Sequence, residues 1–159
     1  MGDHVSVLTG ESAQPEPAFD PGEVAGMRSA GVILLLGAAV TILAWASRPV
    51  GVPVSILIDV FLGVQLLRLK HSWRAWAMLR AALGGLLAIV GVGGLILGAA
   101  PASAVLAGTG SIAYCAAILL LLVGAPTSVR VRVGQAVFAL AVVLMVGAIL
   151  LIAAGSPVA

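Results

Sequence analysis

The stretch from Asp59 to Arg80, DVFLGVQLLRLKHSWRAWAMLR, decides the fold. It opens with a carboxylate inside an apolar run and ends on a basic turn that carries Trp73 and Trp76. Basic residues and tryptophans between two apolar runs are typical of a membrane–water boundary. The stretch therefore predicts two membrane-spanning helices joined by a turn at the membrane surface, and the charge of that turn orients the chain.

The composition extends this interpretation to the whole chain. Of its 159 residues 62% are hydrophobic and 9% are charged, whereas soluble domains carry about 25% charged residues. A chain of this size and apolarity needs lipid as its solvent. Nucleic-acid binders carry a dense basic face, and the eight scattered bases do not form one, so we expect no nucleic-acid partner.

Five apolar runs approach the length of about 20 residues that a spanning helix needs. They predict an all-α, polytopic transmembrane helical bundle with spans at about residues 30–46, 53–69, 77–99, 104–123 and 134–154. The second span is the weakest, because it is short and holds Asp59, Gln65 and Arg68. Leaving it at the surface gives a four-span alternative. We favour five spans, because residues 53–67 are too apolar for a surface.

Two segments outside the spans are expected to lack helical structure. Residues 1–22 are acidic and rich in proline, which predicts a disordered tail ahead of a transmembrane domain at residues 23–159. The alternating segment SVRVRV, residues 128–133, resembles a strand. No second strand is available to pair with it, so we expect a juxtamembrane loop.

The basic residues predict the orientation. With five spans, seven of the eight bases fall on one side of the membrane and Arg48 alone on the other. Loops rich in Lys and Arg stay on the cytoplasmic side. We therefore expect a multi-pass cell-membrane protein with a cytoplasmic N-terminus and an external C-terminus. The four-span alternative leaves the count at seven against one.

Asp59 is the main candidate for a functional group, because it is the sole acid after residue 23. A charge at mid-membrane costs about 2.5–3.5 kcal/mol on insertion scales, so such a group is protonated, paired or in contact with water. We expect an inward-facing, protonated carboxyl, with Arg48 as the one base near enough to oppose this. Depth along the spans groups Asp59 with further polar residues in one candidate cluster: Asp59, Thr41, Thr109, Ser111, Tyr114 and Arg48.

The basic turn is expected to act as an anchor at the cytoplasmic membrane surface. Bases near anionic headgroups contribute about 1 kcal/mol each, and indole rings favour the same depth. The predicted anchor residues are Arg68, Lys70, Trp73, Arg74, Trp76 and Arg80. His71 lies among them without a carboxylate, Cys or His cluster in sequence.

Glycines concentrate in the third span, and small residues let membrane helices approach closely. We therefore expect this span to be the central packing helix, with a dimer interface as the alternative. The predicted packing residues are Gly84, Gly85, Gly91, Gly94 and Gly98.

Motifs for catalysis are lacking in the sequence. The single cysteine, Cys115, has no nearby base, and no metal-ligand spacing or phosphate-binding loop occurs. We expect no catalytic residues, no metal, no cofactor and no enzymatic activity. The leading hypothesis is an assembly or interaction component, whose partners are anionic lipid and either a second copy or another membrane protein. The alternative is a small transporter or ligand-binding membrane protein that uses the cluster around Asp59.

Overall fold

A computed structural model describes residues 20–47, 54–124 and 126–155, which are helical almost throughout and include no strand. Four of the helices in these ranges are long and apolar enough to cross a membrane, and α2 is a shorter apolar helix. The protein is therefore an all-helical membrane bundle of four to five spans. The elements are α1 (Pro21–Ser47), α2 (Val54–Leu67), the short 3-10 helix η1 (His71–Trp73), α3 (Arg74–Leu97), α4 (Ala102–Leu122) and α5 (Ser128–Ala153).

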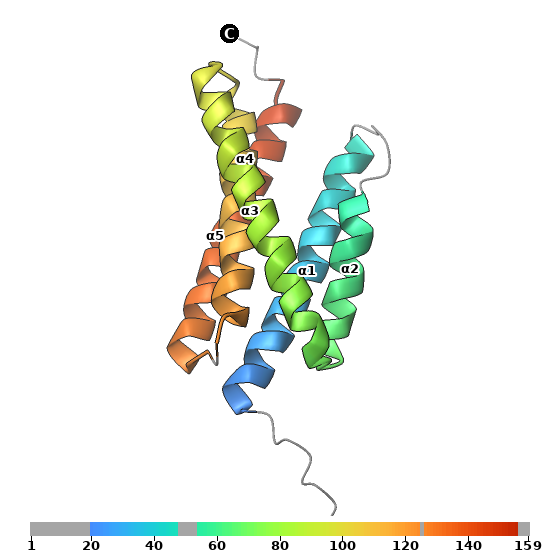
Figure 1. Cartoon of the computed structure of the whole chain (residues 1–159). Coiled ribbons are helices and arrows are strands. Elements are labelled where there is room, and N and C mark those ends of the chain that lie inside the picture. Colours follow the sequence, from blue (N-terminus) through green and yellow to red (C-terminus); the bar gives the residue numbers. More distant parts are fainter. Residues whose placement is uncertain (1–19, 48–53, 125, 156–159) are drawn as a thin grey trace, which may run out of the picture.

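The helices form two groups. α1 and α2 pack as an antiparallel pair, while α4 packs between α3 and α5 and also contacts α1 (Figure 1). Successive helices run in opposite directions, so α1 begins at one end of the bundle and α5 ends at the other (Figure 1). The prediction that the third span is central is wrong: α3 lies at the periphery, with 6% of its spanning window buried, and α4 is the central helix.

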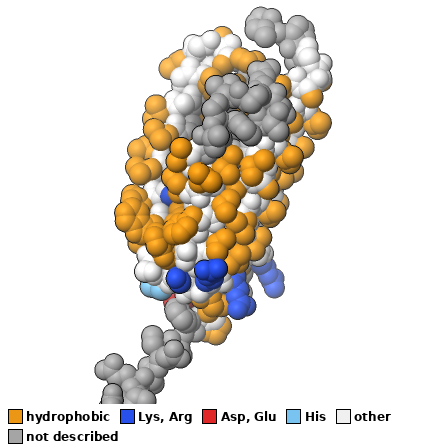
Figure 2. Space-filling view, turned by 90° about the vertical axis from the view of Figure 1, so that its right-hand side faces the viewer, with side chains coloured by type: hydrophobic (Ala, Val, Ile, Leu, Met, Phe, Trp, Pro, Cys, Tyr) orange, Lys and Arg blue, Asp and Glu red, His pale blue; other side chains and the backbone are white. Residues whose placement is uncertain are grey.

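We call the end where α1 begins the basic end, because Lys and Arg side chains gather there (Figure 2). Arg68 and Lys70 follow α2 at this end, and Arg130 and Arg132 lie in the first turns of α5. The opposite end, where α5 ends, is the far end. Hydrophobic side chains cover the face between the two ends (Figure 2), as expected for a surface in contact with lipid.

The core lies in the half of the bundle nearest the basic end. Its largest fully buried side chains come from the first half of α1 and the last turns of α2 and α4: Met27, Leu34, Leu66, Ile118, Leu121 and Leu122. The first turns of α3 add Ala77 and Ala81, both fully buried. Toward the far end the two helix groups diverge (Figure 1), and the side chains between them enclose a cavity instead of a core.

Glycines at helix crossings allow the close packing, but they are not the predicted ones. A Cβ on Gly31 of α1 would lie 2.9 Å from the Gly63 carbonyl oxygen of α2, and a Cβ on Gly63 would lie 3.0 Å from the Gly31 carbonyl oxygen. The two backbones therefore touch through their glycines. By contrast, a Cβ on Gly91 or Gly94 of α3 would meet nothing within 4 Å.

The remaining predicted packing glycines divide in the same way. Gly84 and Gly85 face Cys115 of α4, whereas a Cβ on Gly98 would approach atoms of its own helix alone. The expected role in packing therefore holds for Gly84 and Gly85. Gly91, Gly94 and Gly98 have no such role within the described monomer.

Two helices begin six or more residues earlier than predicted. α1 begins at Pro21 instead of residue 30, which places Glu23 in its first turn. α5 begins at Ser128, so the segment expected to be a loop is helical. Thr127 explains this start, because its side-chain oxygen accepts a hydrogen bond of 3.3 Å from the Arg130 N–H and caps the helix. The predicted disordered tail extends to residue 22, but Pro21 and Gly22 belong to α1, and residues 1–19 lie outside the described residues.

Candidate functional site

A cavity of about 390 Å³ lies where the two helix groups diverge, and every one of the five α-helices contributes to its wall. Its lining combines an acid, a base, hydroxyl groups and small residues. The residues are Gly37 and Thr41 of α1; Ser55 and Asp59 of α2; Arg80, Gly84, Leu87 and Ala88 of α3; Ser111, Tyr114 and Cys115 of α4; and Met145 of α5.

Asp59 and Arg80 form an ion pair in the cavity wall. The Arg80 Nε lies 3.3 Å from Asp59 Oδ1, and the Arg80 Nη2 donates a hydrogen bond of 3.4 Å to Asp59 Oδ2. Asp59 is 6% exposed, which confirms that it faces inward. Both distances are at the long end for charge-assisted hydrogen bonds, and Asp59 Oδ1 accepts no well-aligned hydrogen bond among the described residues. The Asp59–Arg80 ion pair is therefore loose, in the sense that its contacts are long and its hydrogen bonds are not saturated.

Gly84 makes room for the guanidinium group. A Cβ at this position would lie 2.5 Å from the Arg80 Nη1. Because residues four apart on a helix share one face, Arg80 lies back along α3 over the gap that Gly84 leaves. This glycine was predicted as a helix-packing residue, and its position adds a second role: it lets a long basic side chain lie against its own helix.

Tyr114 brings a buried phenol to the same cavity. Its side chain is 9% exposed, and its hydroxyl has no hydrogen-bond partner among the described residues. Gly37 of α1 creates the space for the ring, since a Cβ there would lie 2.5 Å from the ring and 2.6 Å from the hydroxyl oxygen. A buried hydroxyl without a partner is costly, so the cavity presents a donor that a bound molecule can satisfy.

The hydroxyl groups of the predicted cluster are only partly brought together. Thr41 and Ser111 line the cavity and donate to backbone carbonyls four residues earlier, at 2.9 and 3.0 Å. Their oxygens keep lone pairs that can accept further hydrogen bonds. Thr109 makes the same kind of bond, of 2.8 Å to the Val105 carbonyl, but does not line the cavity. Ser55 and Cys115, which the predicted cluster did not include, do line it.

The expectation that Arg48 is the one base near enough to Asp59 is wrong. Arg48 lies outside the described residues, and the base paired with Asp59 is Arg80, which was expected at the membrane surface. Helix depth explains this. Asp59 lies eight residues before the end of α2 and Arg80 six residues after the start of α3. At about 1.5 Å per residue both are roughly 10 Å from the basic end. The expectation of a protonated Asp59 rested on the removal of its carboxylate from water with only Arg48 to oppose it, and the pairing with Arg80 opposes it as well.

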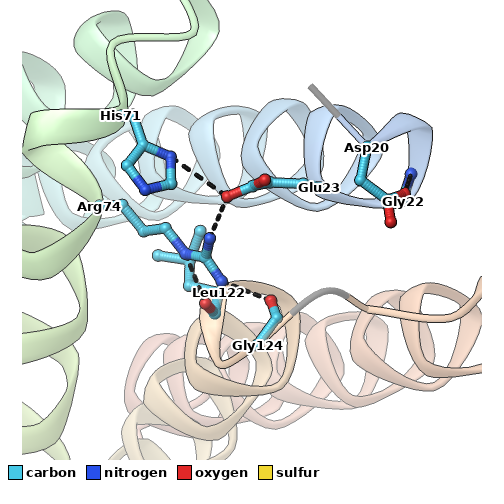
Figure 3. A network of polar contacts seen from close by, with 7 residues as sticks. All are labelled: Asp20, Gly22, Glu23, His71, Arg74, Leu122 and Gly124. Carbon is cyan, nitrogen blue, oxygen red and sulfur yellow. Dashed lines mark hydrogen bonds and ion pairs between the residues drawn. The ribbon is translucent and has the colours of Figure 1, made fainter. Parts of the chain in front are cut away.

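A second ion pair, between Arg74 and Glu23, joins helices at the basic end (Figure 3). Arg74, at the start of α3, binds Glu23 of α1 and the carbonyl oxygen of Gly124, and its Nε donates a hydrogen bond of 2.7 Å to the Leu122 carbonyl. Glu23 also lies 3.1 Å from the Nδ1 of His71. Arg74 therefore joins three helices and caps the last carbonyls of α4.

The other predicted anchor residues divide between surface and core. Arg68, Lys70 and Trp76 are exposed at or near the basic end. Trp73 is half-buried and packs edge-on against Phe61 of α2, with ring centroids 4.8 Å apart. Arg74 was placed wrongly, because its guanidinium faces inward onto Glu23 and α4 instead of toward headgroups.

The described residues contain no group of three or more His, Cys, Asp or Glu side chains that could hold a metal ion. The cavity instead offers one cation, one anion and several hydrogen-bonding groups. Comparisons with protein-family models, curated proteins and solved structures find no match to the chain. Its function must therefore be inferred from the chemistry of these residues.

Proposed function

We propose that this protein is a small ligand-binding membrane protein of the transporter type, which takes a small polar ligand into the cavity around Asp59 and Arg80. The observation that carries the proposal is the cavity itself: it holds a loosely paired acid and base together with the unpartnered hydroxyl of Tyr114.

The energetics of membranes support this proposal. Ionisable side chains inside the bilayer are expensive, and they mark ligand or ion pathways more often than not. A purely structural pair would be expected to saturate its hydrogen bonds in a dry site. Asp59 and Arg80 instead border a cavity of about 390 Å³, which exceeds by about tenfold the volume of one water molecule in the liquid.

We also propose that the chain makes five passes, with the basic end in the cytoplasm among anionic headgroups. The grouping of Arg68, Lys70, Arg130 and Arg132 at one end supports this orientation. α2 supports the fifth pass, because it runs back alongside α1 (Figure 1). The ion pair then lies roughly 10 Å from the cytoplasmic end of the helices, and the cavity extends from it toward the outside.

Two neighbouring residues of α3 provide a matched test. Ala88 lines the cavity, whereas Ile89 is exposed on the outer surface of the bundle. In a Cys115→Ser background, which removes the only native cysteine, Ala88→Cys should react with a charged, membrane-impermeant thiol reagent added from outside. Ile89→Cys should not react, because it faces hydrocarbon. Equal protection of both positions would mean that the cavity is dry and would overturn the proposal.

Ligand binding can be tested without knowing the natural ligand. A panel of small anions, cations, zwitterions and polyols should include at least one class that raises the thermal midpoint of the purified protein. A ligand at a hundred times its Kd stabilises by about 2.7 kcal/mol. Asp59→Asn should abolish the shift. A shift that persists in Asp59→Asn would place the binding elsewhere.

One observation favours the other candidate function, an assembly component. The outer part of α3 exposes Gly91, Gly93 and Gly94, where a Cβ would meet nothing within 4 Å. Such a surface permits close approach of another helix. Cross-linking through Gly94→Cys in native membranes tests this: a disulfide-linked dimer would support assembly, and its absence would leave the ligand-binding function.

A further inference from the structure

α2 and α3 are consecutive in the chain, yet they hardly contact each other. Above their shared turn α3 crosses toward α4 while α2 stays beside α1 (Figure 1). The seam between α2 and α3 is therefore closed by side chains and not by helix packing. The Asp59–Arg80 pair spans this seam, one residue from each helix.

An apolar groove of about 440 Å³ lies on the outer side of the same seam. Leu57 and Phe61 line it from α2, and Trp76, Leu79 and Leu83 line it from α3. These side chains are between 46% and 64% exposed, so the groove faces the hydrocarbon of the bilayer. A groove of this composition suits a hydrocarbon chain.

Arg80 lines both the groove and the polar cavity. On α3 the cavity continues toward the far end, to Leu87 and Ala88, whereas the groove continues toward the basic end, to Trp76 and then to Trp73 of η1. With the far end external, the order from outside to inside is polar cavity, ion pair, apolar groove. An amphiphile bound with its head in the cavity and its chain in the groove has its two parts in this same order.

We propose that the ligand is an amphiphile with a zwitterionic head and a hydrocarbon chain, which enters sideways from the bilayer through the seam between α2 and α3. This inference rests on the proposed function, since it requires the cavity to bind a ligand. The head occupies the cavity and the chain lies in the groove. The Asp59–Arg80 pair separates the two compartments until the ligand takes its place.

The charges of the cavity specify the class of head. The lining residues carry one anion, Asp59, and one cation, Arg80. A ligand with a single charge would neutralise one of them and leave the other buried without a partner, which is strongly unfavourable. A zwitterion replaces both partners at once: its anionic group binds Arg80 and its ammonium group binds Asp59. Tyr114 can then donate its unpartnered hydroxyl to the anionic group.

The test uses the purified full-length protein in maltoside micelles and a single-chain phosphoethanolamine amphiphile that carries a photoreactive diazirine in its chain. We expect cross-links to Phe61 and Leu83 in the groove. The unlabelled amphiphile should compete for labelling. An analogue with a phosphoglycerol head should compete at least tenfold more weakly, because it lacks the ammonium group, and soluble phosphoethanolamine about a hundredfold more weakly, because it lacks the chain.

Two variants and one control locate the two parts of the site. Leu83→Trp fills the groove and Arg80→Gln removes the cation, so each should lower specific labelling about tenfold. Leu83 is 53% exposed, so the larger side chain does not crowd the core. Leu86→Trp adds the same bulk at another exposed position of α3 outside the groove and should change nothing.

The alternative outcomes separate the two proposals. Labelling that is independent of the head, or unchanged in Leu83→Trp, would identify ordinary lipid contact and overturn the amphiphile proposal. Soluble phosphoethanolamine that binds as well as the amphiphile, and equally in Leu83→Trp, would leave a solute-binding cavity and overturn sideways entry alone. A cavity closed to thiol reagents at Ala88→Cys, together with no head-specific labelling, would overturn both proposals.

Discussion

Arg74 and Arg80 are six residues apart on α3, and both pair with a carboxylate, but their surroundings differ. Arg74 binds Glu23 and two carbonyl oxygens at the end of α4, and its side chain is 14% exposed. Arg80 meets Asp59 alone, at 3.3 and 3.4 Å, and its side chain is 29% exposed beside a cavity.

The difference follows from where each pair lies relative to the core. Arg74 enters the basic end, where the helices converge and backbone carbonyls are within reach. Arg80 lies where the two helix groups begin to diverge, and among the described residues its guanidinium pairs with Asp59 alone. A hydrogen-bond network in which every donor and acceptor is paired fixes one arrangement of its side chains. A network with unpaired donors or acceptors keeps those groups available to a ligand. We therefore assign a structural role to the first pair and a binding role to the second.

The largest effect is expected from Arg74→Ala. This change leaves Glu23 without its guanidinium partner and removes donors from the Leu122 and Gly124 carbonyls. Breaking a buried pair on one side costs about 3 kcal/mol or more, so we expect about 3 kcal/mol of lost stability in denaturant unfolding of the purified protein. Arg132→Ala, an exposed base at the same end, is the control. Equal losses in the two variants would contradict the structural role of Arg74.

A smaller effect is expected from Gly31→Ala. This variant tests the contrast between the half of the bundle nearest the basic end, which holds the core, and the half nearest the far end, where the cavity lies. The added Cβ would lie 2.9 Å from the Gly63 carbonyl oxygen, so α1 and α2 must separate. Overpacking of this kind costs about 1–3 kcal/mol. Gly94→Ala is the matched control on α3, where space is open, and it should gain about 0.5 kcal/mol from helix propensity. A gain in stability for Gly31→Ala and a loss for Gly94→Ala would show that α3 packs against a partner through Gly94.

Replacing both members of each pair sharpens the comparison further. Buried ion pairs exchanged for apolar residues of similar size are often neutral or stabilising. We expect Asp59→Leu/Arg80→Met to change stability by less than about 1 kcal/mol and to lose all ligand-induced stabilisation. Glu23→Leu/Arg74→Met should cost about 1–3 kcal/mol, because the α4 carbonyls stay unpaired. Thermal unfolding of both double variants, with and without ligand, measures this. A large loss in the first double variant would make Asp59 and Arg80 structural.

The sequence predicts the class of fold because lipid imposes strong constraints on length and apolarity. The five apolar runs at residues 30–46, 53–69, 77–99, 104–123 and 134–154 correspond to five helices, with starts that differ by up to nine residues. The largest difference, at α1, arises because the helix includes polar residues such as Glu23, which pairs with Arg74. The apolar run alone does not predict helical residues that precede it.

The site is predicted in part, for a similar reason. Depth counting groups Asp59, Thr41, Ser111 and Tyr114 correctly, because depth depends on the rise per residue alone. It does not give rotation about the helix axis, so Thr109 falls outside the cavity. It also misses Arg80, which was counted with the surface turn although its depth matches that of Asp59. Glycine density was misleading for α3, because packing depends on which face a glycine occupies.

The smallest effect concerns two turns, one at each end of the bundle. Leu69 follows α2 at the basic end with φ 55°, and Ala99 follows α3 at the far end with φ 50°. Both are in the left-handed region, which costs a non-glycine residue roughly 1–2 kcal/mol. Both turns close with a hydrogen bond to a carbonyl five residues earlier, from Lys70 to Gln65 and from Ala100 to Leu95. The local backbone geometry is therefore the same at the two ends.

The two turns differ in what their side chains contact, and substitution by glycine separates the two contributions. Leu69 packs against the core, whereas Ala99 is exposed. Ala99→Gly relieves the φ penalty, and the greater freedom of the unfolded chain offsets part of the gain, so we expect about 0.5 kcal/mol of added stability. Leu69→Gly relieves the same penalty but loses the packing of a Leu side chain, so its net effect should be destabilising. Denaturant unfolding of both variants measures the contrast. A gain in both would mean that the basic end is no better packed than the far end, and the difference between the two halves of the bundle would then rest on the Arg74 network alone.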